Sequence, residues 1–256
     1  MIDFPNAKIN LGLNILEKRA DGFHNIETVF YPIELFDILE IIPSGKEPVS
    51  FTSTGHTIPG DRQSNLCLKA FHLLSSIFHL PPAKIHLHKV IPIGAGLGGG
   101  SSDAAFTIKL LNKLFLLGLS DDQMMDYARN LGSDCAFFIL NKPVFAFNKG
   151  DHFEPLELDL SGFRIKISTP EIYINTAEAY AMIEIQPESM GSYPPLKKII
   201  GQPIEEWKNL LVNDFEKPVI KKYPELGIIK QDLYDQGAIY VSMTGSGSSM
   251  FGIFPL

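Results

Sequence analysis

A glycine-rich segment in the first half of the chain carries the residues best suited to bind a phosphate group. It holds five glycines and two serines just before a predicted helix: Pro92, Ile93, Gly94, Ala95, Gly96, Leu97, Gly98, Gly99, Gly100, Ser101 and Ser102. Glycine lets the backbone approach an anion closely, and the amides at the start of a helix favour anionic oxygens. A tight turn would need only one or two glycines. We therefore predict a phosphate-binding loop.

The same segment also matches the dinucleotide-binding pattern Gly-x-Gly-x-x-Gly at Gly94, Gly96 and Gly99. A nicotinamide-dependent oxidoreductase is therefore a rival hypothesis. Pro92 counts against it, because a central parallel strand needs the backbone amide that proline lacks. The predicted helix after the loop also leads directly into another helix, without a strand between them. No Gly-Lys-Ser/Thr follows the glycines, so the segment is not a Walker A loop.

Two charged residues, Lys8 and Asp134, stand next to apolar sequence. Lys8 interrupts an apolar strand pattern, although a lysine at an exposed strand edge would explain it as well. Asp134 lies between Gly132, which is predicted to end a helix, and the apolar run 135–140, where an aspartate could cap the next helix. On these patterns alone, the structural and the catalytic interpretations of both residues stay open.

Composition and charge exclude several classes of partner. The chain has 256 residues, of which 45% are hydrophobic, enough for one large domain or two of ordinary size. A net charge of −7 provides no basic field for nucleic acid or an anionic membrane. Cys67 and Cys135 lack metal-ligand spacing, which predicts reduced thiols. With no targeting segment or membrane-spanning run, we expect a cytoplasmic protein; protein partners are left open.

The predicted elements are mixed, so the expected fold class is α+β. Strands are expected near residues 8–16, 28–33, 38–42, 85–90, 163–168 and 238–243, and helices near 66–78, 103–115 and 120–131. The last of these helices is the best signalled, because Ser120 and Gln123 form a capping box, and Gly132 is expected as its C′ residue.

A polar stretch at residues 148–151 divides the chain into two mixed halves. We place a domain boundary there, with domains at 1–148 and 149–256. A Pro/Gly-rich surface segment is expected at 186–195.

Three motifs, in order along the chain, resemble those of the GHMP kinase superfamily. They are Pro5-x-Ala7-Lys8-Ile9-Asn10-Leu11, the glycine-rich segment, and Met243-Thr244-Gly245-Ser246-Gly247-Ser248. Three further blocks, Arg19-Ala20-Asp21-Gly22-Phe23-His24, Leu131-Gly132-Ser133-Asp134 and Asn213-Asp214-Phe215-Glu216, are most similar to one family of these kinases. That family phosphorylates the 2-hydroxyl of 4-diphosphocytidyl-2-C-methyl-D-erythritol in the non-mevalonate route to isoprenoid precursors. The resemblance implies a ribosomal-protein-S5-domain-2-like N-terminal domain and a ferredoxin-like C-terminal domain.

The resemblance also implies a role for individual residues. Lys8 and Asp134 match the catalytic pair, in which the aspartate orients the hydroxyl and accepts its proton. The residues 92–102 and Asn65 match the ATP-binding residues, with ATP as co-substrate and Mg²⁺ expected, its ligands unidentified. The residues that match contacts to the cytidylated substrate are Asn10, Phe23, His24, Thr176 and Tyr180. Family members usually carry tyrosine where this chain has Phe23, so the ring is kept and its hydroxyl is lost.

A second rival hypothesis is a sensing protein that kept this fold and lost turnover. Retention of both Lys8 and Asp134 speaks against it. Members of the family commonly continue past the third motif with another helix and strand, so we expect the C-terminal edge of the second domain to be either incomplete or unusually short.

Overall fold

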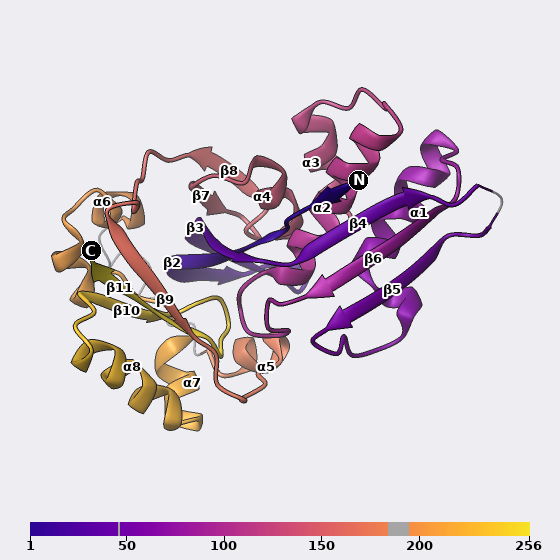
Figure 1. Ribbon diagram of the computed structural model, residues 1–256. Helices are drawn as coiled ribbons and strands as arrows, with labels where there is room; N and C mark the ends of the chain where they lie inside the picture. Colours follow the sequence, from indigo (N-terminus) through magenta and orange to yellow (C-terminus); the bar gives the residue numbers. More distant parts are fainter. Residues whose placement is uncertain (46, 184–194) are drawn as a thin grey trace. The chain divides into compact units, whose positions relative to one another are not determined.

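The computed structural model describes residues 1–45, 47–183 and 195–256, which form two compact α+β units (Figure 1). The α+β class is confirmed. The first unit contains Met1–Lys8, Pro32–Ile93 and Gly98–Lys142, and the second contains Ile9–Tyr31, Gly94–Leu97 and Pro143–Leu256. The predicted segment 186–195 lies, apart from Pro195, outside the described residues.

The two units are not the two halves of the sequence. Two long strands, β2 (Asn6–Lys18) and β3 (His24–Phe36), each contribute residues to both units. The glycine-rich segment also changes unit, because residues 94–97 belong to the second. The boundary expected at residue 148 divides the chain into two consecutive domains, which are defined differently from these interleaved units. That boundary stays a prediction.

The first unit is built on a four-stranded sheet covered by helices. Its strands, in the order β1-β4-β6-β5, are β1 (Ile2–Asp3), β4 (Ile38–Pro43), β6 (Ala83–Lys89) and β5 (Ser50–Gly55). Its helices are the short 3-10 helix η1 (Arg62–Ser64), α1 (Leu66–Phe78), α2 (Gly99–Leu114), α3 (Asp121–Arg129) and α4 (Cys135–Leu140). β4 runs antiparallel to β6, and β5 runs parallel to it. The helix α2 packs against β1 and β4 and contacts the other three α-helices, so it connects the sheet to the helical layer.

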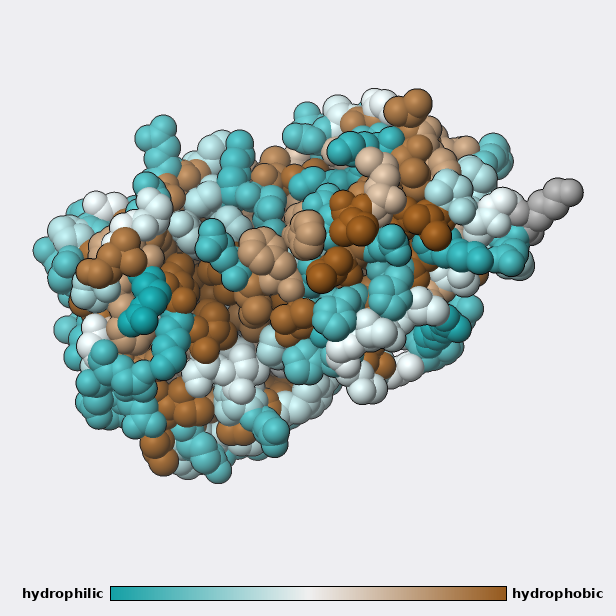
Figure 2. All heavy atoms as spheres, viewed as in Figure 1, coloured by the Kyte–Doolittle hydropathy of each residue, from teal (hydrophilic) through white to brown (hydrophobic). Residues whose placement is uncertain are grey.

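Alternation along β6 explains how this sheet separates core from solvent. Ile85 and Leu87 are each 1% exposed, whereas His86, between them, is only partly buried. Successive strand residues point to opposite faces, so one face of the sheet packs on the helices. On β4 the other face also carries apolar residues: Ile38 and Ile42, on either side of Glu40, are 39% and 41% exposed, and Figure 2 shows hydrophobic residues over this strand.

The second unit contains two antiparallel sheets. The first has the order β2-β3-β7-β8, with β7 (Val144–Phe147) and β8 (His152–Pro155). The second has the order β10-β11-β9, formed by β9 (Phe163–Ser168), β10 (Tyr240–Met243) and β11 (Met250–Pro255). The helical elements are α5 (Thr176–Ala181), α6 (Leu196–Ile200), η3 (Ile204–Asn209), α7 (Glu216–Lys222) and α8 (Glu225–Asp235). The helix α8 packs on β10 and β11.

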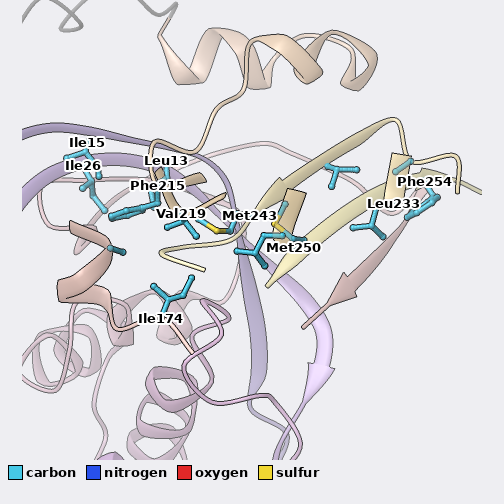
Figure 3. Packing of buried hydrophobic residues seen from close by; sticks show 14 residues of the cluster. Leu13, Ile15, Ile26, Ile174, Phe215, Val219, Leu233, Met243, Met250 and Phe254 are labelled. Atoms are coloured by element: carbon cyan, nitrogen blue, oxygen red, sulfur yellow. The ribbon is translucent and has the colours of Figure 1, made fainter. Parts of the chain in front are cut away.

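A hydrophobic cluster joins these parts of the second unit (Figure 3). Phe215, which precedes α7, is 2% exposed and lies in the same cluster as Leu13 of β2 and Met243 of β10. Fully burying a side chain of this size stabilises the fold by about 1.5–3 kcal/mol. The cluster therefore fixes the start of the third motif against β2.

The predicted capping box of α3 is confirmed: Ser120 Oγ accepts from the amide of Gln123, and the Gln123 side chain accepts from the amide of Ser120. The prediction for Gly132 is wrong. The helix ends at Arg129, and Gly132 has no left-handed backbone, because the Asn130 amide bonds to carbonyls of the last turn and closes the helix first.

Among the described helices, none has both the length and the apolar character needed to cross a membrane.

Candidate active site

The glycine-rich loop has a regular backbone alternation. Gly94, Gly96 and Gly98 have φ values of 68°, 76° and 72°, whereas Ala95 and Leu97 between them do not have positive φ. Residues in alternating left-handed and right-handed conformations form a concave anion-binding nest, and the sign of φ alternates in the same way along this loop. L-residues with a Cβ disfavour the left-handed conformation, which explains why glycine occupies every second position. The loop backbone is therefore shaped to hold phosphate oxygens.

The nest leads directly into the start of α2. Gly98 is the N-cap residue of this 16-residue helix and provides no side-chain capping bond. The first amides of a helix have no partner within the helix, so those of α2 are available to an anionic ligand, which the helix dipole also favours.

Gly98 brings this loop against Lys8. A Cβ at Gly98 would lie 3.2 Å from Lys8 Cε and 2.9 Å from Phe138 Cζ, so a larger residue would push on both side chains. The lysine stem thus runs beside the residue that opens α2. The Lys8 side chain therefore lies, within the first unit, next to the N-terminus of α2.

Lys8 also faces the predicted catalytic carboxylate. Its Nζ lies 3.6 Å from Asp134 Oδ2, and the two side chains are 3% and 34% exposed. Burial lowers the pKa of Lys8, while the charge of Asp134 and a hydrogen bond to it oppose that shift. The structure therefore brings together the two predicted catalytic residues, with a buried cation beside a carboxylate that solvent can still reach.

The alternative role of Asp134 as a helix cap is not supported. Asp134 occupies the N-cap position of α4, but its side chain makes no capping hydrogen bond. Ser120, by contrast, does cap α3, and Asn65 caps α1. The Asp134 carboxylate is held towards Lys8 instead of towards the helix backbone.

A group of rings in the second unit contains three of the predicted substrate contacts. The His24 ring stacks on the Tyr180 ring at 4.4 Å between centroids and 11° between planes. Tyr180 also packs edge-on against Phe215, at 4.9 Å. Phe23 is 53% exposed, with Lys149 Nζ 5.0 Å from its ring centre. The resemblance implies that Phe23 and Tyr180 contact the cytidine base with their rings; here the His24 ring stacks on Tyr180.

The electrostatic surroundings of this ring group favour an uncharged imidazole. Burial lowers the pKa of His24, and the nearby charge of Lys18 lowers it further. A neutral imidazole has one donor and one acceptor nitrogen, the combination that hydrogen-bonds to the polar edge of a base.

Asn10 is held between two threonines. Its side-chain amide donates to Thr28 Oγ1 at 2.9 Å, and its Oδ1 lies 3.2 Å from Thr244 Oγ1. The Asn10 backbone amide donates to the same Thr244 oxygen at 3.1 Å, and that hydroxyl also lies 3.1 Å from the Gly96 carbonyl. Asn10 thus ties the first motif to the third motif and to the glycine loop. Its predicted role as a substrate contact stays a prediction.

Two further predicted contacts have structural partners. Thr176 begins α5, and its hydroxyl lies 3.3 Å from that of Ser246 in the third motif. Asn65 Oδ1 accepts from the amide of Cys67 at 2.9 Å as the cap of α1. The helix-capping role of Asn65 is therefore present, and its contact with ATP stays a prediction.

The Asn213–Glu216 block holds the third motif in place, a role that the sequence did not predict. Asn213 Nδ2 donates to the carbonyls of Met243 and Gly245 at 2.8 and 2.9 Å. Glu216 Oε2 accepts from the Met243 amide at 2.8 Å. These bonds fix the backbone of the third motif, and the sequence signal was the block itself, which carries polar residues around a buried phenylalanine.

The first unit also contains a buried ion triad that the sequence patterns did not predict. Lys89 Nζ donates to Asp37 Oδ2 and to Asp103 Oδ2, both at 2.6 Å. The available signal was a lysine at the end of an alternating strand and an aspartate near the start of α2. In the described part of the chain, no three His, Cys, Asp or Glu side chains gather as a potential metal site.

The chain matches two models of one protein family. Residues 65–142 match the GHMP kinases N terminal domain, and residues 182–256 match the GHMP kinases C terminal domain. The chain is 55% identical to the 4-diphosphocytidyl-2-C-methyl-D-erythritol kinase of Cytophaga hutchinsonii over 99% of this chain and 92% of that protein. It is 52% identical to the protein of that name from Bacteroides fragilis, with the same coverage.

A solved structure agrees with these relatives. The crystal structure of a 4-(cytidine 5'-diphospho)-2C-methyl-D-erythritol kinase superposes with a TM-score of 0.83 at 31% identity, covering 99% of this chain and 90% of that one. The fold and the sequence therefore point to the same group of proteins.

Proposed function

The chain belongs to the 4-diphosphocytidyl-2-C-methyl-D-erythritol kinases of the GHMP kinase family, and we propose that it transfers the γ-phosphoryl group of ATP to the 2-hydroxyl of that cytidylated polyol. The observation that carries the proposal is the Lys8–Asp134 pair beside Gly98, where the glycine loop enters α2. A cation and a carboxylate beside the residue at which the loop enters its helix are parts that transfer to a hydroxyl requires.

The proposed chemistry divides between positioning and electrostatics. The amides of the loop and of the first turn of α2 hold the phosphates, and Asp134 orients the acceptor hydroxyl and accepts its proton. Lys8 holds its cation beside that carboxylate and stabilises charge on the phosphoryl oxygens. Phosphoryl transfer passes through a loose transition state, so correct placement of the two reactants supplies most of the catalysis.

The cytidine group is proposed to bind at the rings of the second unit. Phe23 and Tyr180 offer ring faces, His24 offers a neutral imidazole, and Thr176 and Asn10 offer polar contacts. In the geometry described, the base would take the place of the His24 ring on Tyr180 or stack on the exposed Phe23 ring. Either arrangement makes the cytidylated compound a better substrate than the free polyol.

ATP is the proposed co-substrate, with Asn65 near its adenine. When bound, Mg²⁺ neutralises charge on the phosphate oxygens. Asp103 is a poor candidate ligand, because its carboxylate is 4% exposed and bonded to Lys89. We therefore propose that Mg²⁺ arrives with ATP and is held mainly by the phosphates, as is common for this ion. Localisation in the cytoplasm stays a prediction.

The test is release of ADP with four acceptors offered separately: the cytidylated methylerythritol, free methylerythritol, mevalonate and homoserine. We expect turnover with the first alone. Equal turnover of mevalonate or free methylerythritol would contradict the proposed substrate. A change in absorbance that depends on a nicotinamide cofactor would support the oxidoreductase, and binding of ATP and polyol without turnover would support a sensing protein.

A further inference from the structure

The buried triad Asp37, Lys89 and Asp103 combines three separate parts of the first unit. Asp37 lies between β3 and β4, Lys89 is the last residue of β6, and Asp103 lies in the first turns of α2. Their side chains are 0%, 3% and 5% exposed. The two 2.6 Å contacts of Lys89 Nζ therefore join two strand ends to the start of a helix.

One carboxylate of the triad fixes the chain where it enters the glycine loop. Asp37 Oδ1 accepts from the backbone amides of Val90 and Ile91 at 2.6 and 2.9 Å. Those residues immediately precede Pro92. Asp37 is held in turn by its own amide, which donates to the Pro5 carbonyl at 2.8 Å. The entry of the loop is thus bonded to a side chain that is itself anchored.

The other end of the triad lies where the chain leaves the loop. Asp103 extends from α2 to Lys89, and a Cβ at Gly99 would lie 2.9 Å from Lys89 Nζ. The lysine ammonium therefore sits directly beside the first residue of α2. One cation connects the carboxylate that holds the loop entry to the carboxylate on the helix that the loop enters.

A gain in folding stability does not readily explain why three charged residues are buried in this position. Burying charged groups costs several kcal/mol per ion, and apolar residues of similar volume are often as stable or more so. Asp103 Oδ1 is buried and has no hydrogen-bond partner among the described residues. Burial also raises the pKa of Asp103, because a charged carboxylate is less stable away from water than a protonated one.

We propose that the triad Asp37–Lys89–Asp103 is a positioning device that holds the two ends of the glycine loop at a fixed separation, so that the loop amides are preorganised for the phosphates of ATP. The proposal rests on the proposed function in one respect, that this loop binds ATP. The three residues act through the loop backbone and touch neither substrate. Preorganisation lowers the cost of ordering the loop on binding, so loss of the triad weakens nucleotide binding before it affects the polyol.

The deciding variant is Asp103→Asn. Asparagine keeps the size and an oxygen that can accept from Lys89, and the remaining Lys89–Asp37 pair is electrically balanced, so the fold should survive. We expect the KM for ATP and the calorimetric Kd for ADP to rise about tenfold, the effect of weakening one charge-assisted hydrogen bond. The KM for the cytidylated polyol should change less than about twofold. Asp37→Asn should act in the same direction.

The control for mere destabilisation is Leu74→Ala, a truncation at a fully buried residue of α1 outside the triad. It should lower the melting temperature and leave the Kd for ADP unchanged. Amide hydrogen exchange over residues 90–102 should become faster in Asp103→Asn and not in Leu74→Ala, because only the first releases the loop.

The proposal is overturned if Asp103→Asn melts at a lower temperature but binds ADP within about twofold of the wild type. The triad would then be structural only. If Asp37→Asn does not fold, Asp103→Asn decides alone. Because ADP binding is measured directly, a wild type that binds ADP without phosphorylating the cytidylated polyol would contradict the proposed function and leave this test valid.

Discussion

Lys8 Nζ lies 3.6 Å from Asp134 Oδ2, and the carboxylate that faces it makes no capping bond to the helix it precedes. A cap would have directed Asp134 towards the amides of α4. The pair has instead one buried and one solvent-accessible member: the buried lysine holds a cation at the site, and the accessible carboxylate can meet a substrate hydroxyl.

Asp134→Asn should reduce kcat by about 10²–10⁴-fold, the usual contribution of a positioned general base. The two side chains have nearly the same shape, so the melting temperature and the affinity for both substrates should hold. Lys8→Ala should cause a similar fall, and the double variant should cost little more if the two residues act as one unit. Steady-state kinetics and calorimetry on the three variants provide the measurement.

The opposite outcome for Asp134→Asn would be a lower melting temperature with more than about a tenth of kcat retained, a loss below the range for such a base. Asp134 would then be structural. The transition state would need no protein base, and Lys8 and the loop would carry the chemistry electrostatically.

The sequence predicted the elements whose causes are local. The α+β pattern, the helix at 66–78 and the capping box of Ser120 depend on periodicity and on contacts within a few residues. The pairing of Lys8 with Asp134 was predicted through resemblance alone, because no local rule joins residues so far apart in the sequence.

What the sequence missed depends on tertiary packing. The apolar run 135–140 forms the short helix α4, although periodicity does not distinguish a buried helix from a strand in so few residues. Asp37 and Lys89 are 52 positions apart, and the pattern shows that each lies near apolar neighbours without showing that they meet. The stack of His24 on Tyr180 joins two elements of the second unit in the same way.

Tyr180→Ala should weaken binding of the cytidylated substrate by about 1–3 kcal/mol, the usual effect of losing one base-stacking ring. Phe23→Ala should behave alike, and the double variant should be non-additive if both rings grip one base. ATP affinity should stay unchanged. Isothermal titration with each ligand measures the effect, and Phe36→Ala, at a ring that is 43% exposed in the first unit, is the matched control.

A larger effect of Phe23→Ala on ATP than on the polyol would move Phe23 to the nucleotide side. If Tyr180→Ala weakened neither ligand, the stack of His24 on Tyr180 would be part of the fold and not a site for the base.

Asp103 should make the stability of the chain depend on pH. Burial raises the pKa of its carboxyl to about 7 from an ordinary 3.8; the charge of Asp37 adds to the rise, and Lys89 opposes it. Between these two values the folded chain binds a proton that the unfolded chain has released. The contribution of Asp103 to the free energy of unfolding therefore falls as pH rises through this window, and it is constant above and below it.

The measurement is urea unfolding of the wild type and of Asp103→Asn at several values from about pH 4 to about pH 8. Asparagine does not titrate, so the wild type should lose stability relative to the variant as the pH rises. A difference that stays constant, or that grows with pH, would show that Asp103 is ionised throughout and that Lys89 outweighs its burial.

Gly98→Ala should damage both the loop and Lys8. The residue has φ 72°, where an L-residue costs about 1–2 kcal/mol, and the added Cβ would lie 3.2 Å from Lys8 Cε. We expect a lower free energy of unfolding together with a fall in kcat, because the methyl group displaces the lysine that faces Asp134. Gly162→Ala is the control, since its Cβ would have nothing within 4 Å and its φ is not positive. That variant should keep full activity and a free energy of unfolding within about 1 kcal/mol of the wild type. If Gly98→Ala lost stability and kept kcat, the added methyl group would not disturb the catalytic position of Lys8, and this part of the prediction would be wrong.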